Sequence, residues 1–297
     1  MFRINKKYSK LFSKRFTGDS SMLTKFNTTI LFGILGVLIF QNVSKTSYFT
    51  NKTYGNFPRD IIDNIKFSEL KFNKDGTFKI AILGDLHLKK DNFEYDLNKT
   101  IVDNKPDLVI LNGNIMDNSN TLSSVDRLNK IMTNNSIPFI YNFGKSENKL
   151  YLKEKVYDYL SRHSLNYRQY YYGGLTNQLV KLSLNNKYFY FVVLLDSNGN
   201  NMNINQLNYL DKVCKINNNI NGMLFVHKQI HEINNNEGVL NDGLLNVLKG
   251  CNNVNIVFNG DSQGNNKCKY LHGKKMCFSS SKIQYFTLDN YGRSEIF

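Results

Sequence analysis

The fold is decided by the stretch Phe78-Lys-Ile-Ala-Ile-Leu-Gly-Asp-Leu-His87, in which an apolar segment of strand length runs into two ligand-type side chains. Alternate residues of a strand point to the same face, so Asp85 and His87 are expected on one side, where the strand leaves the sheet. A carboxylate and an imidazole at this spacing can reach one metal ion. The stretch predicts a core strand that ends in a metal site, and a surface turn is the alternative for an isolated Asp-x-His.

Two later segments repeat this pattern. Asp107-Leu-Val-Ile-Leu-Asn-Gly-Asn114 and Ile137-Pro-Phe-Ile-Tyr-Asn-Phe-Gly144 have the length of buried strands, and both end in Gly and polar residues. Segments with helical spacing of apolar residues lie at 91–105, 123–133 and 149–161. Strands that alternate with helices predict a parallel sheet, with its functional groups at the carboxyl ends of the strands.

From Gly174 onward the pattern predicts a second sheet. Residues 179–184 and 188–195 form a predicted hairpin around Asn185-Asn186, and 204–215 form an amphipathic helix. Further strands are predicted at 222–227, which ends in His227, and at 255–260, 276–278 and 284–288, with a helix at 243–248. The fold class is therefore α/β.

The amino-terminal part has a different composition. Nine Lys and Arg residues and the single Asp19 fall in residues 1–52, so most of the formal net charge of +14 lies there. An apolar run of 13 residues, Thr28 to Phe40, follows the basic arm. The predicted organisation is a basic tail at 1–27, a transmembrane or signal-anchor segment at 28–43, a linker and lead-in at 44–74, and a folded domain at 75–297.

The apolar run is shorter than the roughly 20 residues that span a bilayer and is close to the apolar region of a signal peptide. Extension to Met22 and Val43 makes a span, and the lack of a small-x-small cleavage site after Phe40 favours an uncleaved anchor. Basic residues before the run predict a single-pass membrane protein of the secretory pathway with a lumenal or external domain. The basic, acid-free residues 1–18 leave a mitochondrial location as the alternative.

Composition also bears on partners. No Lys and Arg cluster or recognition motif follows residue 52, so the predicted partner is a membrane through residues 28–43, and no nucleic acid is expected. The four cysteines form no Cys-x-x-Cys pair, which argues against a structural zinc site. Cys268 and Cys277 can form a disulfide in a lumenal domain, or remain buried thiols.

In this order the strand ends resemble the calcineurin-like metallophosphoesterases, and most closely their purple-acid-phosphatase-like branch. The family's blocks are Gly-Asp-x-His, Gly-Asp, Gly-Asn-His-Asp/Glu, a strand-end His with an acidic residue, and Gly-His-x-His. The corresponding blocks here are Gly84-Asp-Leu-His87, Gly113-Asn114, Gly144-Lys-Ser-Glu147, His227 with Glu232, and Gly260-Asp-Ser-Gln263. The branch is further matched by Leu195-Asp-Ser197, by Gln206 to Leu210, and by Asn265, Cys268 and Cys277. The resemblance covers residues 75–297 and implies a four-layer α/β/β/α sandwich of two mixed sheets.

The resemblance also implies a centre of two metal ions, and this chain keeps only part of it. Asp85, His87 and His227 match family ligands. The substituted positions are Asn114 for the bridging Asp, Lys145 for the Asn ligand, Ser146 for the catalytic His, and Asp261 and Gln263 for the last two His ligands.

A neutral amide lacks the anionic oxygen that bridges two dications, and an ammonium group repels them. A binuclear centre is therefore not expected. One divalent ion, Mn, Zn or Fe, held by Asp85, His87, His227 and Asp261 is the alternative. We also expect Lys145 to fill the vacated space and to pair with Asp85 or Asp261.

The sequence thus predicts a membrane-anchored phosphoesterase-fold protein, weak or inactive as an enzyme, with a binding or regulatory role toward a phosphorylated substrate or a protein partner. An active metal-dependent phosphatase of phosphomonoesters or phosphoproteins, with a reduced metal site, is the alternative. A third interpretation makes the basic residues 1–25 a membrane-surface tether and the domain a scaffold.

Overall fold

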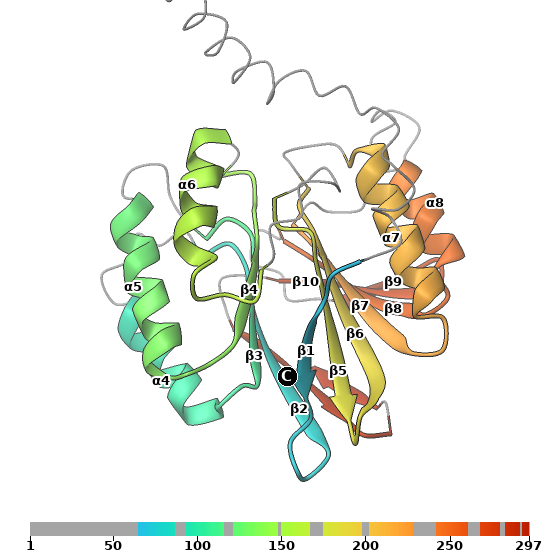
Figure 1. Cartoon of the computed structure of the whole chain (residues 1–297), viewed down its shortest axis with the longest axis horizontal. Coiled ribbons are helices and arrows are strands. Elements are labelled where there is room, and N and C mark those ends of the chain that lie inside the picture. Colours follow the sequence, from blue (N-terminus) through green and yellow to red (C-terminus); the bar gives the residue numbers. More distant parts are fainter. Residues whose placement is uncertain are drawn as a thin grey trace, which may run out of the picture. The chain divides into compact units, whose positions relative to one another are not determined.

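Two mixed β-sheets lie face to face at the centre of the folded domain, and helices cover their outer faces (Figure 1). The computed structural model describes residues 65–86, 93–115, 121–147, 150–166, 175–197, 202–227, 242–260, 268–279, 283–291 and 293–296. All of these belong to one unit, Phe57–Phe297.

The smaller sheet has the strand order β12-β11-β2-β3-β4. Its strands β2 (Thr77–Leu83), β3 (Leu108–Asn112) and β4 (Phe139–Asn142) pair in parallel. Strand β11 (Gln284–Asp289) pairs antiparallel with β2, and β12 (Ser294–Ile296) pairs antiparallel with β11. The helices α4 (Phe93–Asn104) and α5 (Thr121–Asn134) connect the parallel strands, and α6 (Leu150–Leu160) follows β4. The predicted strand and helix alternation is confirmed.

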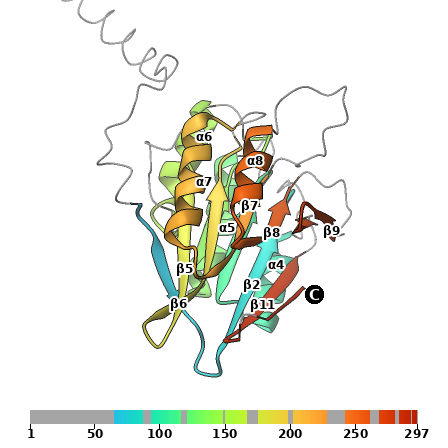
Figure 2. The ribbon, with the colours of Figure 1, turned by 90° about the vertical axis from the view of Figure 1, so that its right-hand side faces the viewer.

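The larger sheet has the order β1-β5-β6-β7-β8-β10-β9. Its strands are β1 (Ser68–Lys71), β5 (Gln178–Leu184), β6 (Lys187–Leu195), β7 (Asn221–Val226), β8 (Val254–Asn259), β9 (Cys268–Leu271) and β10 (Lys274–Phe278). The helices α7 (Ile204–Ile216) and α8 (Asp242–Gly250) lie on its outer face (Figure 2). The predicted hairpin is β5 and β6, and its turn places Asn185 and Asn186 at φ 51° and 62°, as a tight two-residue turn requires.

Three apolar layers hold these elements together: one between the two sheets, and one beneath each set of helices. Strand β2 supplies two of them, because Ile80 and Ile82 face the other sheet while Ala81 and Leu83 face the helices. A strand buried on both faces needs a continuous apolar run, which is why the sequence of β2 shows no alternation.

Two disulfides add covalent links. Cys214 at the end of α7 pairs with Cys251 after α8, and Cys268 pairs with Cys277 directly across β9 and β10. The sequence placed the second pair as one of two alternatives and did not predict the first. All four cysteines of the chain are bonded.

Some expectations differ from the structure or lie outside it. Strand β2 ends at Leu83, so the predicted strand that continues to His87 is too long. Strands β9 and β12 were not predicted, because they are short edge strands with mostly exposed side chains. The predicted tail at 1–27 and anchor at 28–43 lie outside the described residues. None of the described helices is both long and apolar enough to cross a membrane.

Candidate metal centre

The predicted site residues that the structure describes gather where the parallel strands of both sheets end. Asp85 follows β2, Asn114 follows β3, Ser146 and Glu147 follow β4, and His227 follows β7. Three side chains predicted to meet, those of Asp85, Asn114 and His227, do meet there.

Asp85 does not reach the site in the way that the sequence predicted. Its φ is 51°, in the left-handed region, and its N–H donates to the carbonyl of Gly113 at 3.0 Å. A turn therefore directs the carboxylate, and the alternation of strand side chains does not apply. Asn114, at the equivalent position after β3, has a φ of 48°. Asp and Asn tolerate this conformation better than most residues, which fits the residue types at both strand ends.

The His227 imidazole is buried and held in one orientation. Its Nδ1 lies 2.8 Å from the carbonyl oxygen of Asn112, and because a carbonyl only accepts, Nδ1 carries the hydrogen. Its Nε2 lies 4.0 Å from Oδ1 of Asp85 and has no hydrogen-bond partner in the described part of the chain. A histidine that ligates a metal is commonly fixed in this way by its other nitrogen.

Three glycines at the strand ends surround this ring. A side chain at any of them would collide with the ring or with the backbone beside it. A Cβ added at Gly260 would lie 2.1 Å from Nδ1 of His227, and one at Gly113 would lie 2.4 Å from the same atom. A Cβ at Gly144 would lie 2.3 Å from the backbone nitrogen of Asn114 and 2.9 Å from Nε2 of His227. We call Gly113, Gly144 and Gly260 the glycine cradle.

Asn114 uses its side-chain amide for two contacts within the protein. Its Nδ2 donates to Oδ1 of Asp85 at 2.8 Å, and its Oδ1 accepts from the N–H of Ser146 at 2.9 Å. The end of the amide that faces Asp85 is thus a donor. An amide donor therefore satisfies one oxygen of the Asp85 carboxylate from within the protein.

Glu147 is fully buried and forms the other half of this network. Its Oε2 accepts from the backbone N–H groups of Gly144 at 2.7 Å and Asn114 at 3.1 Å, and its Oε1 accepts from Oγ of Ser146 at 2.8 Å. A buried carboxylate needs such donors. Glu147 therefore ties the loop after β3 to the loop after β4.

Of the two partners expected for Lys145, Asp85 does not pair with it. Lys145 is exposed to solvent, and no ion pair among the described residues joins it to Asp85. Its neighbours Ser146 and Glu147 turn inward instead, and the Asn114 amide takes the place next to Asp85. Asp261, the other predicted partner, lies outside the described residues.

These contacts allow a test of which metal positions the residues fit. Asp85 and the bare Nε2 of His227 fit one ion, to which they offer a carboxylate oxygen and an imidazole nitrogen. Asn114 does not fit the bridging position, because it presents N–H groups to Asp85. His87, Asp261 and Gln263 lie outside the described residues. Among the described residues, no cluster of three or more His, Cys, Asp or Glu side chains is placed to hold an ion.

Sequence reasoning missed the asparagines that precede the strand-end glycines. Nδ2 of Asn142 donates to the carbonyl of Leu195 in the other sheet at 2.7 Å, and Nδ2 of Asn112 donates to Oγ of Ser279 at 3.2 Å. They join the two sheets below the site. The repeated order of Asn before Gly, in Asn112-Gly113 and Asn259-Gly260, was the available signal, and it was interpreted only as a strand end.

A buried ion pair near the same edge was also missed. Nζ of Lys153 in α6 lies 3.1 Å from Oδ1 of Asp196, and both side chains are 2 % exposed. Gln206 in α7 donates to the carbonyl of Asp196 at 2.6 Å and to Oδ1 of Asn177 at 3.1 Å. The matched Leu-Asp-Ser and Gln positions thus connect α6, β6 and α7, a structural role that adds no ligand.

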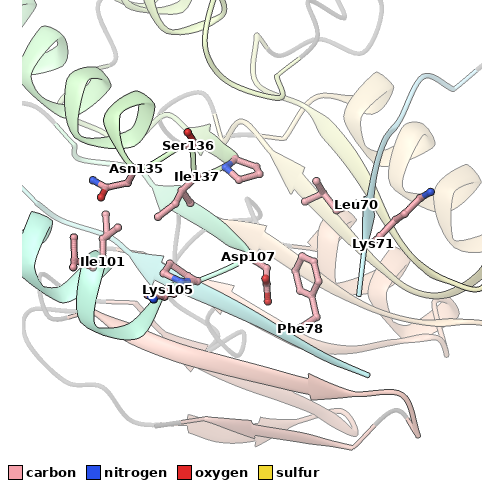
Figure 3. A pocket seen from close by; sticks show the side chains of 12 residues that line it. Leu70, Lys71, Phe78, Ile101, Lys105, Asp107, Asn135, Ser136 and Ile137 are labelled. Atoms are coloured by element: carbon pink, nitrogen blue, oxygen red, sulfur yellow. The ribbon is translucent and has the colours of Figure 1, made fainter. Parts of the chain in front are cut away.

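A hollow lies near the amino-terminal ends of β2, β3 and β4, opposite the candidate site. A cavity of about 540 Å³ is lined by residues that include Leu70, Phe78, Ile101, Asp107 and Pro138 (Figure 3). Oδ2 of Asp107 there accepts from the backbone N–H of Lys79 at 2.7 Å, so the carboxylate is a structural acceptor. The strand-end site remains the better candidate for chemistry.

Comparisons with known proteins agree with the two-sheet α/β fold. The family model "Calcineurin-like phosphoesterase" matches residues 78–262, and the chain therefore belongs to the calcineurin-like phosphoesterase family. This bears out the predicted superfamily.

Two solved structures share the fold. A dimetal phosphatase from Danio rerio is 13% identical, with a TM-score of 0.53, over 70% of this chain and 92% of that one. The protein TT1561 of Thermus thermophilus is also 13% identical, with a TM-score of 0.52, over 74% of this chain and 98% of that one. No curated protein sequence matches the chain.

Proposed function

We propose that this protein is a membrane-anchored pseudophosphatase, a calcineurin-like phosphoesterase domain that is weak or inactive in hydrolysis and acts through binding or regulation. The observation that carries the proposal is the hydrogen bond from Nδ2 of Asn114 to Oδ1 of Asp85, at 2.8 Å. Paired ions activate a water and neutralise phosphoryl charge in two-metal hydrolysis. An amide donor at the bridging position supports the loss of that centre.

The position of the catalytic histidine supports the same conclusion. Ser146 occupies it, and its hydroxyl donates to Oε1 of Glu147. A serine hydroxyl titrates far above neutral pH and replaces an imidazole poorly as a proton donor to a leaving group. Asn114 at the bridging position and Ser146 at the proton-donor position are thus both engaged in hydrogen bonds within the protein.

The anchor, orientation and branch are further parts of the proposal. Residues 28–43 would hold the protein in a membrane with the domain on the lumenal or external side, and a mitochondrial location is the alternative. Two disulfides that pair all four cysteines support an oxidising compartment. The paired Cys268 and Cys277, together with the buried Gln206, support the purple-acid-phosphatase-like branch.

Metal analysis together with a phosphatase assay tests the proposal. The purified full chain is dialysed with Mn²⁺, Zn²⁺ or Fe, its bound metal is counted, and hydrolysis of a phosphomonoester is compared with that of the Asp85→Ala variant. We expect hydrolysis by the native protein at the level of the variant. Stoichiometric metal with turnover that disappears on Asp85→Ala would refute the pseudophosphatase.

A second candidate function is an active phosphatase with one metal ion. The bare, buried Nε2 of His227, 4.0 Å from Asp85, favours it. His87 and Asp261 would complete the ligand set. One ion per chain, with metal and turnover both lost on His227→Ala, is the result expected from this alternative.

Location is tested separately through glycosylation. The acceptor residues Asn98 and Asn134 of two Asn-x-Ser/Thr triplets are exposed. For a lumenal domain we expect endoglycosidase treatment to shift the gel mobility of the native protein and to leave an Asn98→Gln/Asn134→Gln variant less shifted. Co-purification with mitochondria, without any shift, would support the alternative.

A further inference from the structure

The two disulfides differ in how far a reagent can reach them. Cys268 is exposed to solvent, whereas its partner Cys277 is fully buried. Cys214 and Cys251 are only 6% and 1% exposed. Thiol–disulfide exchange requires a thiolate to reach one sulfur, so the exposed residue Cys268 makes Cys268–Cys277 the more accessible of the two disulfides.

The surroundings of Cys268 allow its strand to move. Strand β9 is the outermost strand of its sheet and pairs with β10 alone. Its residues Lys269 and Tyr270 are exposed, Tyr270 by 77%, and only Leu271 is buried. Strand β9 therefore buries little apolar surface of its own, and the Cys268–Cys277 bond is the covalent cross-link that holds it to β10 beyond their two-residue turn.

Cys277 lies two residues before a side chain that supports the strand-end site. Ser279, fully buried, donates its N–H to the carbonyl of Asn259 at 2.7 Å, and its Oγ accepts from Nδ2 of Asn112 at 3.2 Å. The carbonyl of Asn112 in turn holds Nδ1 of His227 at 2.8 Å. A continuous set of contacts thus runs from the disulfide to the imidazole.

We propose that Cys268–Cys277 is a thiol–disulfide exchange site that a dithiol reductant opens, and that its opening loosens the support of Asn112 beneath His227. One thiolate of the reductant attacks Sγ of Cys268, and the electron pair of the broken bond leaves on Sγ of Cys277, which takes a proton. The second thiolate of the reductant then attacks the reductant sulfur of the mixed disulfide. Cys268 leaves as a thiolate and takes a proton. The reductant is oxidised to a cyclic disulfide, and the protein gains two thiols. This inference does not depend on whether the site binds metal.

Graded reduction of the full chain tests the exchange site, with Cys214–Cys251 as the internal control. The protein in detergent is treated with increasing dithiothreitol, free thiols are alkylated with a maleimide, and the modified cysteines are located by mass spectrometry. We expect Cys268 and Cys277 to be labelled at least about tenfold faster than Cys214 and Cys251, because rate depends on access. Equal rates, or faster labelling of Cys214 and Cys251, would overturn the proposal.

Amide hydrogen exchange on the same partly reduced sample tests the link to the site. We expect faster exchange in peptides that contain Ser279 and Asn112, and unchanged exchange in α7 (Ile204–Ile216), which the other disulfide still restrains. Faster exchange confined to β9 would show that reduction opens the edge strand without reaching His227, and would refute that part of the proposal. Because native protein is reduced in place, the test does not require a cysteine variant to fold.

Discussion

The two sides of the strand-end site, one around His227 and one around Asn114, differ in what the chain has kept. On the His227 side, the glycine cradle and the Asn112 carbonyl hold an imidazole whose Nε2 is bare. On the Asn114 side, the amide, Ser146 and Glu147 satisfy one another by hydrogen bonds. One side retains a shape suited to a ligand, and the other is a polar network of hydrogen bonds within the protein. The proposed loss of hydrolysis therefore need not disturb the packing on which the fold depends.

The largest expected effect concerns the cradle. Gly260→Ala places a Cβ 2.1 Å from Nδ1 of His227, and the fully packed ring can yield only by breaking its bond to the Asn112 carbonyl. We expect a loss of about 3 kcal/mol in the free energy of unfolding, measured by chemical denaturation. The matched control is Gly250→Ala, where a Cβ meets nothing within 4 Å and the change should stay within about 1 kcal/mol. Equal losses in the free energy of unfolding of the two variants would show that the glycine cradle accommodates a Cβ.

A somewhat smaller effect is expected at Glu147. Glu147→Ala removes the acceptor of two backbone N–H groups and of the Ser146 hydroxyl, all inside the protein, and should lower the free energy of unfolding by about 2–3 kcal/mol. Glu147→Gln should lower it by only about 1 kcal/mol, because the amide oxygen still accepts both N–H groups and the hydroxyl can rotate to accept from the amide. Denaturation of both variants beside the exposed Glu295→Gln provides the comparison. If Ala and Gln behave alike, the hydrogen bonds of Glu147 do not hold the loops together.

The next prediction concerns a substitution that places a metal-ligating side chain on the Asn114 side. Asn114→Asp puts a carboxylate where the amide donor lies 2.8 Å from Asp85, and two adjacent carboxylates without a cation repel. In chelator at neutral pH we expect a loss of about 1–2 kcal/mol. The repulsion raises the folded-state pKa at which the pair takes up its first proton, and one proton relieves the repulsion, so the loss should disappear as the pH falls through that raised pKa.

Metal addition completes this test. Mn²⁺ or Zn²⁺ should restore the thermal stability of Asn114→Asp by binding the folded state, while the exposed Asn255→Asp serves as a control without a metal response. If added metal leaves the thermal stability of Asn114→Asp unchanged at every concentration, the amide of Asn114 is not the group that keeps metal from the bridging position.

The fold was predictable because buried strands leave a strong signal. Continuous apolar runs located β2 and β3, and their polar, Gly-containing ends located the site. Strand β9 could not be found in this way, since its side chains are mostly exposed and its place depends on pairing with β10. Sequence periodicity reports burial, and edge strands are little buried.

For the site residues that the structure describes, the sequence predicted the position along the strand ends better than the bonding. Asp85, Asn114 and His227 meet as expected, yet the inward turn of Glu147 and the outward turn of Lys145 depend on the backbone between them. Charge alone favoured Asp85 or Asp261 as the partner of Lys145, and Asp261 lies outside the described residues. The short amide of Asn114 reaches that carboxylate from the neighbouring strand end, and a contact between neighbouring strand ends is not encoded in the spacing of residues along one of them.

The smallest expected effect falls on this same corrected residue. Lys145 is exposed and forms no ion pair with Asp85, so Lys145→Ala should change the free energy of unfolding by less than about 0.5 kcal/mol. The difference between native and variant protein should also be independent of salt, since only an ion pair would be screened. Salt titration of both proteins by denaturation measures this. A loss above about 1 kcal/mol at low salt that fades at high salt would show that the Lys145 ammonium group forms a stabilising ion pair on the Asn114 side. The contrast between the two sides would then rest on charge as well as on hydrogen bonds.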